Sequence, residues 1–193
     1  MLIFFFETVD IEYISKEEGD NVLDGYTLPP EQFSKSGVTV ATGVDLGARN
    51  LNDLKGLDSK IIEKLKPYLG LKGKNAKKQL DLIPLKLSEK ESNTLNKFIQ
   101  KKILTKLKTK WNNDSKIKFN KLSTEQATVL ASVAFQYGSS FKRTDGTQMN
   151  FYSLALNNDW QGVYDELMDF KDNYPTRRKE EAAYLKKYLK KIK

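Results

Sequence analysis

The segment from Thr124 to Tyr137 limits the fold most, because its side chains are apolar on nearly every side of a helix. Its apolar residues are Ala127, Val129, Leu130, Val133, Ala134 and Phe135. A helix with so little polar surface is normally buried. The sequence therefore predicts a central buried helix with other helices packed around it.

Two of the predicted helices share the same start signal. Ser88 and Ser123 are followed three residues later by Glu91 and Gln126, and a leucine precedes each serine. This spacing is typical of a capping box, which satisfies free N–H groups in the first turn of a helix. Apolar residues at helical spacing predict helices over 51–56, 59–69, 73–81, 88–109, 124–137, 149–156, 159–170 and 176–191, with a loop around Asn112, Asn113 and Asp114.

Residues 20–50 have a different composition, in which glycines and prolines separate short β-branched stretches. The clearest stretch is 38–42, and it predicts a small β hairpin. Before it, a short helix is expected over Asp10–Glu18, ending at Gly19. We expect an α+β fold in a single domain over 1–193, with a hairpin lobe at about 20–50 and a larger helical lobe from 1–19 and 51–193.

The 193-residue chain has no histidine and no cysteine. Disulfides, the usual zinc sites, thiol nucleophiles and imidazole chemistry are therefore excluded, and we expect no metal and no cofactor. The economical enzyme class is a two-carboxylate hydrolase, of which glycosidases are the main example. Glu18 at the end of the first helix and Asp45 beyond the 38–42 strand are the candidate pair.

The residues around these acids resemble the active-site signature of the phage-type lysozymes and their toxin relatives, the pesticin group. Glu18 and Gly19 are similar to the family's Glu-Gly pair, and residues 39–47 are similar to its Thr-Ile-Gly-x-Gly-like strand. Further similarities, in the family's order, lie at residues 130–138, 158–160 and 174–180. The resemblance spans about residues 10–190 and implies a lysozyme-like fold.

The same resemblance implies a muramidase, which hydrolyses the β-1,4 bond between N-acetylmuramic acid and N-acetylglucosamine in peptidoglycan. It assigns Glu18 as the general acid that protonates the glycosidic oxygen. It gives Thr39 the task of placing the attacking water, and Asp45 that of base or electrostatic partner. Inversion at the sugar is expected, as in the apparent relatives.

Three residues of the second half are implied to support the site. Arg177 corresponds to the arginine that orients the catalytic glutamate. Gln136 resembles an amide lining the cleft, with a helix C-cap as the alternative, and Tyr137 beside it is expected to support substrate binding.

The chain departs from the phage pattern near the hairpin. Val44 stands where many phage enzymes have histidine, and Ala41 stands where they have the first glycine of Gly-x-Gly. Their aspartate between the glutamate and the threonine has no clear equivalent. Asp45 is therefore preferred as the second carboxylate, with Asp24 as the second choice, and Glu17 competes with its neighbour for the role of acid.

The chain is basic, with 33 lysines and arginines against 25 acids and a net charge of +8. Such a charge favours polyanionic partners, and peptidoglycan carries carboxylates. Specific nucleic-acid recognition is not expected, because nearly all the basic residues are lysines. The alternatives are a lysine-rich helical binding module for nucleic acid or a partner protein, using 97–121 and 186–193, and a lysozyme fold that has lost catalysis and only binds glycan.

The apolar run over residues 1–6 is too short to span a membrane and lacks the features of a signal peptide. It predicts a short buried strand or the first turns of a packed helix. We therefore expect synthesis in the cytoplasm without a signal peptide, and action in the periplasm or cell wall of a target bacterium. A monomer is the default expectation. Delivery as an antibacterial toxin, a secretion-system effector or a phage endolysin would agree with this expectation. For a toxin, we expect an immunity protein that occludes the cleft.

Overall fold

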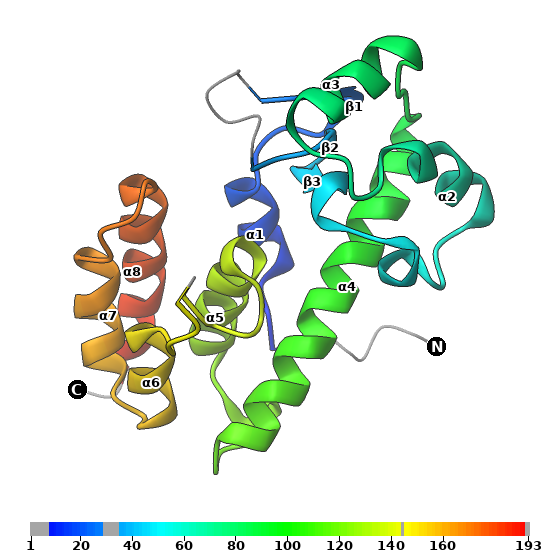
Figure 1. Cartoon of the computed structure of the whole chain (residues 1–193). Coiled ribbons are helices and arrows are strands. Elements are labelled where there is room, and N and C mark those ends of the chain that lie inside the picture. Colours follow the sequence, from blue (N-terminus) through cyan, green and yellow to red (C-terminus); the bar gives the residue numbers. More distant parts are fainter. Residues whose placement is uncertain (1–7, 29–34, 144, 192–193) are drawn as a thin grey trace. The chain divides into compact units, whose positions relative to one another are not determined.

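The computed structural model describes residues 8–28, 35–143 and 145–191, which are mostly helical with one small sheet (Figure 1). The helices are α1 (Ile11–Glu17), α2 (Ser59–Leu65), α3 (Gly73–Leu82), α4 (Glu89–Asp114), α5 (Thr124–Tyr137), α6 (Asn150–Leu156), α7 (Trp160–Met168) and α8 (Pro175–Leu189). The strands are β1 (Val22–Tyr26), β2 (Thr39–Ala41) and β3 (Val44–Asp45). The predicted α+β class is confirmed, whereas the prediction for residues 1–6 lies outside the described residues.

The chain divides into two compact units, which we call the helical unit and the sheet unit. The helical unit takes the described residues up to Glu17 and from Lys101 onward, and the sheet unit is Glu18–Gln100. The sheet unit therefore runs past residue 50, where the hairpin lobe was expected to end. That the whole chain forms a single catalytic domain stays a prediction.

Helix α5 is the centre of the helical unit. All of its residues from Glu125 to Ala134 are buried, and it packs against α1 and α8, while α7 packs against α6 and α8 (Figure 1). The predicted capping box is present: Ser123 Oγ accepts from the Gln126 N–H at 3.2 Å, and Gln126 Oε1 accepts from the Ser123 N–H at 2.8 Å. The prediction of a central buried helix is confirmed.

Helix α4 is longer than predicted and continues to Asp114, so the prediction of a loop around Asn112, Asn113 and Asp114 is wrong. Trp111 is buried in this last part of the helix, and its indole N–H donates to the Ile117 carbonyl at 2.7 Å. Lys110 and Asp114 form an ion pair at 2.7 Å, one turn apart. These contacts hold the last turn helical despite three residues of low helix propensity.

The sheet has the order β1-β2-β3, with both pairs antiparallel. Tyr26 on β1 and Asp45 on β3 both pair with Thr39 on β2. Directly opposed residues in antiparallel strands present their side chains on the same face of the sheet. One row across the sheet therefore carries a phenol, a hydroxyl and a carboxylate.

The turn between β2 and β3 is strained and anchored. Ala41 has a φ of 57° and Gly43 a φ of 75°, so an alanine adopts the left-handed conformation that favours glycine. Between them, Thr42 donates through its backbone N–H and its hydroxyl to Asn96 Oδ1 on α4, at 3.2 and 2.8 Å. The turn is thus tied to the part of α4 that belongs to the sheet unit.

Candidate functional site

Glu18 follows directly on the last residue of α1 and is half-buried. Gly19 ends the helical path with a φ of 84°, a value that glycine adopts without strain. The helix end predicted from the sequence is therefore confirmed. The end of this helix fixes the position of Glu18 in the backbone.

Thr39 and Asp45 are brought together in the sheet unit. They are direct partners in the β2–β3 ladder, and Thr39 is only 6% exposed while Asp45 is half-buried. A hydroxyl and a carboxylate on neighbouring positions of one face are able to hold a single water molecule by hydrogen bonds. The structure thus brings Thr39 and Asp45 together, and their roles in catalysis stay predictions.

The Asp45 carboxylate also shapes the loop beside the sheet. Its Oδ1 accepts from the Gly37 N–H at 3.0 Å and from the Gly47 N–H at 2.8 Å, and it caps the 3₁₀ helix η2 (Leu46–Ala48). One oxygen is therefore committed to the backbone. Asp24, the second choice, has a side chain that is 70% exposed and pairs with Lys86 at 3.6 Å.

Arg49 is a neighbour of this site that the sequence reasoning missed. Burial lowers the pKa of Arg49, and the charges of Asp53 and Asp45 act in the opposite direction. The guanidinium thus lies within the electrostatic reach of Asp45. The sequence offered a signal, because Arg49 is one of four arginines in the chain and follows Asp45 by one turn's length.

Glu17, the competitor for the acid role, has a raised pKa. Burial, followed by a hydrogen bond to and the charge of Glu180, raises the pKa of Glu17 to about 7, while Arg177 acts to lower it. Glu17 also lines a cavity of about 550 Å³ with Tyr13 and Tyr184. A carboxyl that titrates near neutrality has the property expected of a general acid, so Glu17 must be tested beside Glu18.

Arg177 is half-buried on α8 and is held in the helical unit. Its Nη1 donates to the backbone carbonyl of Glu17 at 3.3 Å, and its Nη2 donates to the carbonyl of Ser132 at 3.2 Å. Its guanidinium therefore reaches the backbone of the residue that precedes Glu18 in the chain.

Gln136 and Tyr137 end α5 but do not cap it, since the C-cap is Gly138. The alternative reading of Gln136 as a C-cap is therefore wrong: its Oε1 accepts from Arg178 Nη2 at 2.5 Å. Tyr137 donates to Asp172 Oδ2 at 2.7 Å and lines a cavity of about 600 Å³. Their roles in substrate binding stay predictions.

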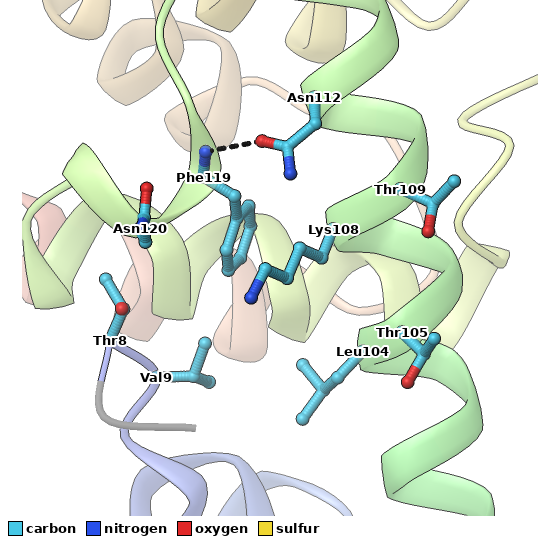
Figure 2. A pocket seen from close by; sticks show the side chains of 9 residues that line it. All are labelled: Thr8, Val9, Leu104, Thr105, Lys108, Thr109, Asn112, Phe119 and Asn120. Carbon is cyan, nitrogen blue, oxygen red and sulfur yellow. Dashed lines mark hydrogen bonds between the residues drawn. The ribbon is translucent and has the colours of Figure 1, made fainter. Parts of the chain in front are cut away.

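A further cavity, of about 260 Å³, lies in the helical unit and contains none of the predicted site residues. Val9, Leu104 and Phe119 form its apolar part, and Figure 2 shows the Lys108 side chain extending into it. Asn112 Oδ1 accepts from the Phe119 N–H at 2.7 Å at one edge. The described residues that line this cavity include no carboxylate.

The described residues hold neither a candidate metal cluster nor a candidate membrane span. Among the described residues, no three carboxylates lie close enough together to hold a metal ion. Within the same residues, every helix is too short or too polar to cross a bilayer.

Comparison with known protein families identifies the family of this chain. Residues 8–161 match the Pesticin family, described as a bacterial toxin homologue of phage lysozyme, C-term. The match covers well over half of the chain, so the chain belongs to this family and has its α+β lysozyme-like fold. No curated protein matches the chain. Glu18, Thr39, Asp45, Gln136 and Tyr137 lie inside the matched range, and Arg177 lies beyond it.

Membership defines the class. The chain is a homologue of lysozyme-type toxins, which are glycoside hydrolases. The family implies peptidoglycan as the substrate.

Proposed function

We propose that this protein is a muramidase that hydrolyses the β-1,4 bond between N-acetylmuramic acid and N-acetylglucosamine in peptidoglycan. The observation that carries the proposal is the direct pairing of Thr39 with Asp45. It supports a mechanism in which one water is held by the hydroxyl and activated by the carboxylate. The family match supports the substrate.

Each of the three groups has one task in this mechanism. Glu18, as the acid, gives its proton to the glycosidic oxygen as the bond to the anomeric carbon breaks. Thr39 orients the attacking water, and Asp45 accepts a proton from it. The water attacks from the face opposite the leaving sugar, so the configuration at the anomeric carbon inverts.

Asp45 is a better second carboxylate than Asp24 for two reasons. Asp24 is exposed and pairs with Lys86, whereas Asp45 is half-buried beside Thr39. Partial burial strengthens the interaction of a carboxylate with a water or a developing charge. Oδ2 of Asp45 is then the oxygen that accepts the hydrogen bond and the proton from the water, because Oδ1 accepts from two backbone N–H groups.

Arg177, Gln136 and Tyr137 are proposed to support the reaction, as the family resemblance implies. Arg177 orients the acid, and its bond to the Glu17 carbonyl supports this role. Gln136 and Tyr137 would bind the glycan.

The setting is part of the proposal. A toxin of this kind acts on the cell wall of a target bacterium after delivery, and an immunity protein that occludes the cleft protects the producer. The net charge of +8 supports attraction to the carboxylates of peptidoglycan over distances of several ångströms.

The test compares two neighbouring substitutions. Turbidity loss of purified Gram-negative peptidoglycan is measured for the wild type, Glu18→Gln and Glu17→Gln, and the released fragments are analysed by mass. We expect clearing by the wild type, fragments with reducing muramic acid ends, and a loss of at least about 100-fold for Glu18→Gln. Glu17→Gln changes the competing carboxyl, and on this proposal it keeps most of the activity.

Other results would change the assignment. Loss in Glu17→Gln with activity kept in Glu18→Gln would move the acid to Glu17. Fragments with reducing glucosamine ends would contradict a muramidase. No clearing by the wild type, together with binding to the sacculi, would favour the catalytically lapsed fold.

A further inference from the structure

A buried cluster of charged and polar groups joins α5 to α8 in the helical unit. Its centre is Glu181, which is fully buried. Its Oε1 accepts from Ser132 Oγ at 2.5 Å, from Arg178 Nη2 at 3.0 Å and from Arg177 Nε at 3.3 Å. Oε2 is buried with no hydrogen-bond partner among the described residues.

The cluster holds the guanidinium of Arg177 on three sides. Nε donates to Glu181, Nη2 donates to both the carbonyl and the hydroxyl oxygen of Ser132 at 3.2 Å, and Nη1 donates to the Glu17 carbonyl at 3.3 Å. Hydrogen bonds on three sides restrict the rotation of a planar guanidinium. Glu181 and Ser132 therefore supply three of the acceptors that hold it in place.

Stability alone does not account for a carboxylate at this place. The buried face of α8 is formed by Arg178, Glu181, Ala182, Leu185 and Leu189. At each position of such a buried face, including that of Glu181, an apolar side chain is the usual choice. Burial raises the pKa of Glu181, and the two arginines and Ser132 only act against that rise. Replacing such a buried ion pair with apolar residues is often neutral or stabilising, so its presence here calls for another reason.

We propose that Glu181, assisted by Ser132, is a positioning residue that fixes Arg177 for its action on the catalytic acid. The proposal rests on the proposed function, in which Arg177 orients Glu18. Glu181 lies one helical turn after Arg177 on the same helix, and Ser132 receives the guanidinium from the facing helix. Arg178 and Gln136 complete the cluster, since Arg178 Nη2 donates to both Glu181 and Gln136.

Kinetics provide the first test. Glu181→Gln keeps the size of the side chain and removes its charge, and Ser132→Ala removes one hydroxyl. We expect both to lower kcat on the order of 10- to 100-fold with KM within about twofold, because misplacing an orienting group by about 1 Å costs on that scale. Adding either change to Arg177→Ala is expected to cause no further loss, since the two residues act through Arg177.

The matched control is Glu125→Gln. Glu125 is also buried in the helical unit and pairs with Lys191 at 2.6 Å, but it does not contact Arg177. This change is expected to lower the free energy of unfolding and leave kcat unaltered. Equal kcat losses in Glu125→Gln and Glu181→Gln, or additive losses with Arg177→Ala, would overturn the proposal.

A spectroscopic measurement separates this proposal from the proposed function. The chain has four arginines, so their Nε–H resonances are readily assigned by substitution. We expect hindered rotation and slow exchange of the Arg177 Nε–H in the wild type, and faster exchange in Glu181→Gln and Ser132→Ala. Should the wild type fail to cut peptidoglycan while these changes in exchange are seen, the proposed function fails and the anchoring of Arg177 stands. If the wild type is active and Arg177 exchange is the same in all variants, the positioning role is wrong.

Discussion

Thr39 and Asp45 lie directly opposite each other on the antiparallel strands β2 and β3. Their side chains leave the sheet on the same face, although five residues separate them in the chain. The short turn around Thr42 makes this pairing possible, and Asn96 on α4 holds that turn. The relationship ties the candidate chemistry to the stability of the hairpin, so the two must be separated by experiment.

Asp45 is expected to have two separable roles. Asp45→Asn keeps an oxygen that accepts from Gly37 and Gly47 and removes the charge, so activity should fall at least about 100-fold with little change in stability. Asp45→Ala removes both hydrogen bonds and should also lower the free energy of unfolding by about 1–2 kcal/mol. Urea unfolding and peptidoglycan clearing of both variants provide the check. An active Asp45→Asn variant would contradict its role as base.

The backbones of Gly37 and Gly47 approach each other closely, so neither position should tolerate a side chain. A Cβ at Gly47 would lie 2.5 Å from the Leu71 carbonyl oxygen and 2.7 Å from Gly37 Cα, and these are backbone atoms that cannot turn aside. Gly47→Ala should therefore destabilise the sheet unit by about 1–3 kcal/mol. Gly70 is the control, because a Cβ there meets nothing within 4 Å, although its φ is 73°. Gly70→Ala should cost only about 1 kcal/mol in thermal or denaturant unfolding, and equal losses in the two variants would argue against the clash.

The pair Glu17 and Glu180 should make stability depend on pH. The pKa of Glu17 is raised to about 7 from an ordinary value of 4.5, so between these values the folded protein binds more protons than the unfolded chain. The contribution of Glu17 to stability is therefore present below about pH 4.5 and is lost as the pH rises to about 7. Because the group is partly exposed, we expect a loss of about 1 kcal/mol after allowing for solvent screening.

This dependence is measured as the difference between the wild type and Glu17→Gln in denaturant unfolding from pH 4 to 8. The glutamine variant should lack this part of the decline. Glu180→Gln should reduce it, because Glu180 is the second cause of the raised pKa after burial. Parallel stability curves for all three proteins would refute the coupling.

The capping box of α5 should contribute measurably to stability. Ser123→Ala removes the hydroxyl that accepts from the Gln126 N–H and should cost about 1 kcal/mol. The neighbouring Thr124 is exposed at the first helical position, so Thr124→Ala should be close to neutral. Differential scanning calorimetry of the two alanine variants makes the comparison, and a similar melting temperature for both would count against the cap.

The helices were predictable because their signals are local. The capping box at Ser123 and the apolar run behind it predicted α5 with its observed bounds, Thr124–Tyr137. The glycine after Glu18 likewise marked the end of α1. Local signals failed at the end of α4, where a buried tryptophan and an ion pair extend a helix through residues that favour loops.

The candidate site was predictable in part. The resemblance identified Thr39 and Asp45 as a functional pair, and their opposition in the sheet agrees with that reading, while their roles in catalysis stay predictions. Arg49 and Glu181 were not predicted, although the scarcity of arginine was a signal for Arg49. Glu181 stands in the charged stretch of α8, where an exposed side chain is the ordinary expectation.

The sequence by itself determined the helix boundaries set by caps and glycines, the buried nature of α5, and the exclusion of imidazole and thiol chemistry. Only the tertiary structure decided which charges are buried. Hydrophobic periodicity reports which face of a helix turns inward, but whether a glutamate on that face is stable depends on donors from other segments. Glu181 is buried because Ser132 and two arginines bind its carboxylate, and these groups come together only when α5 and α8 pack.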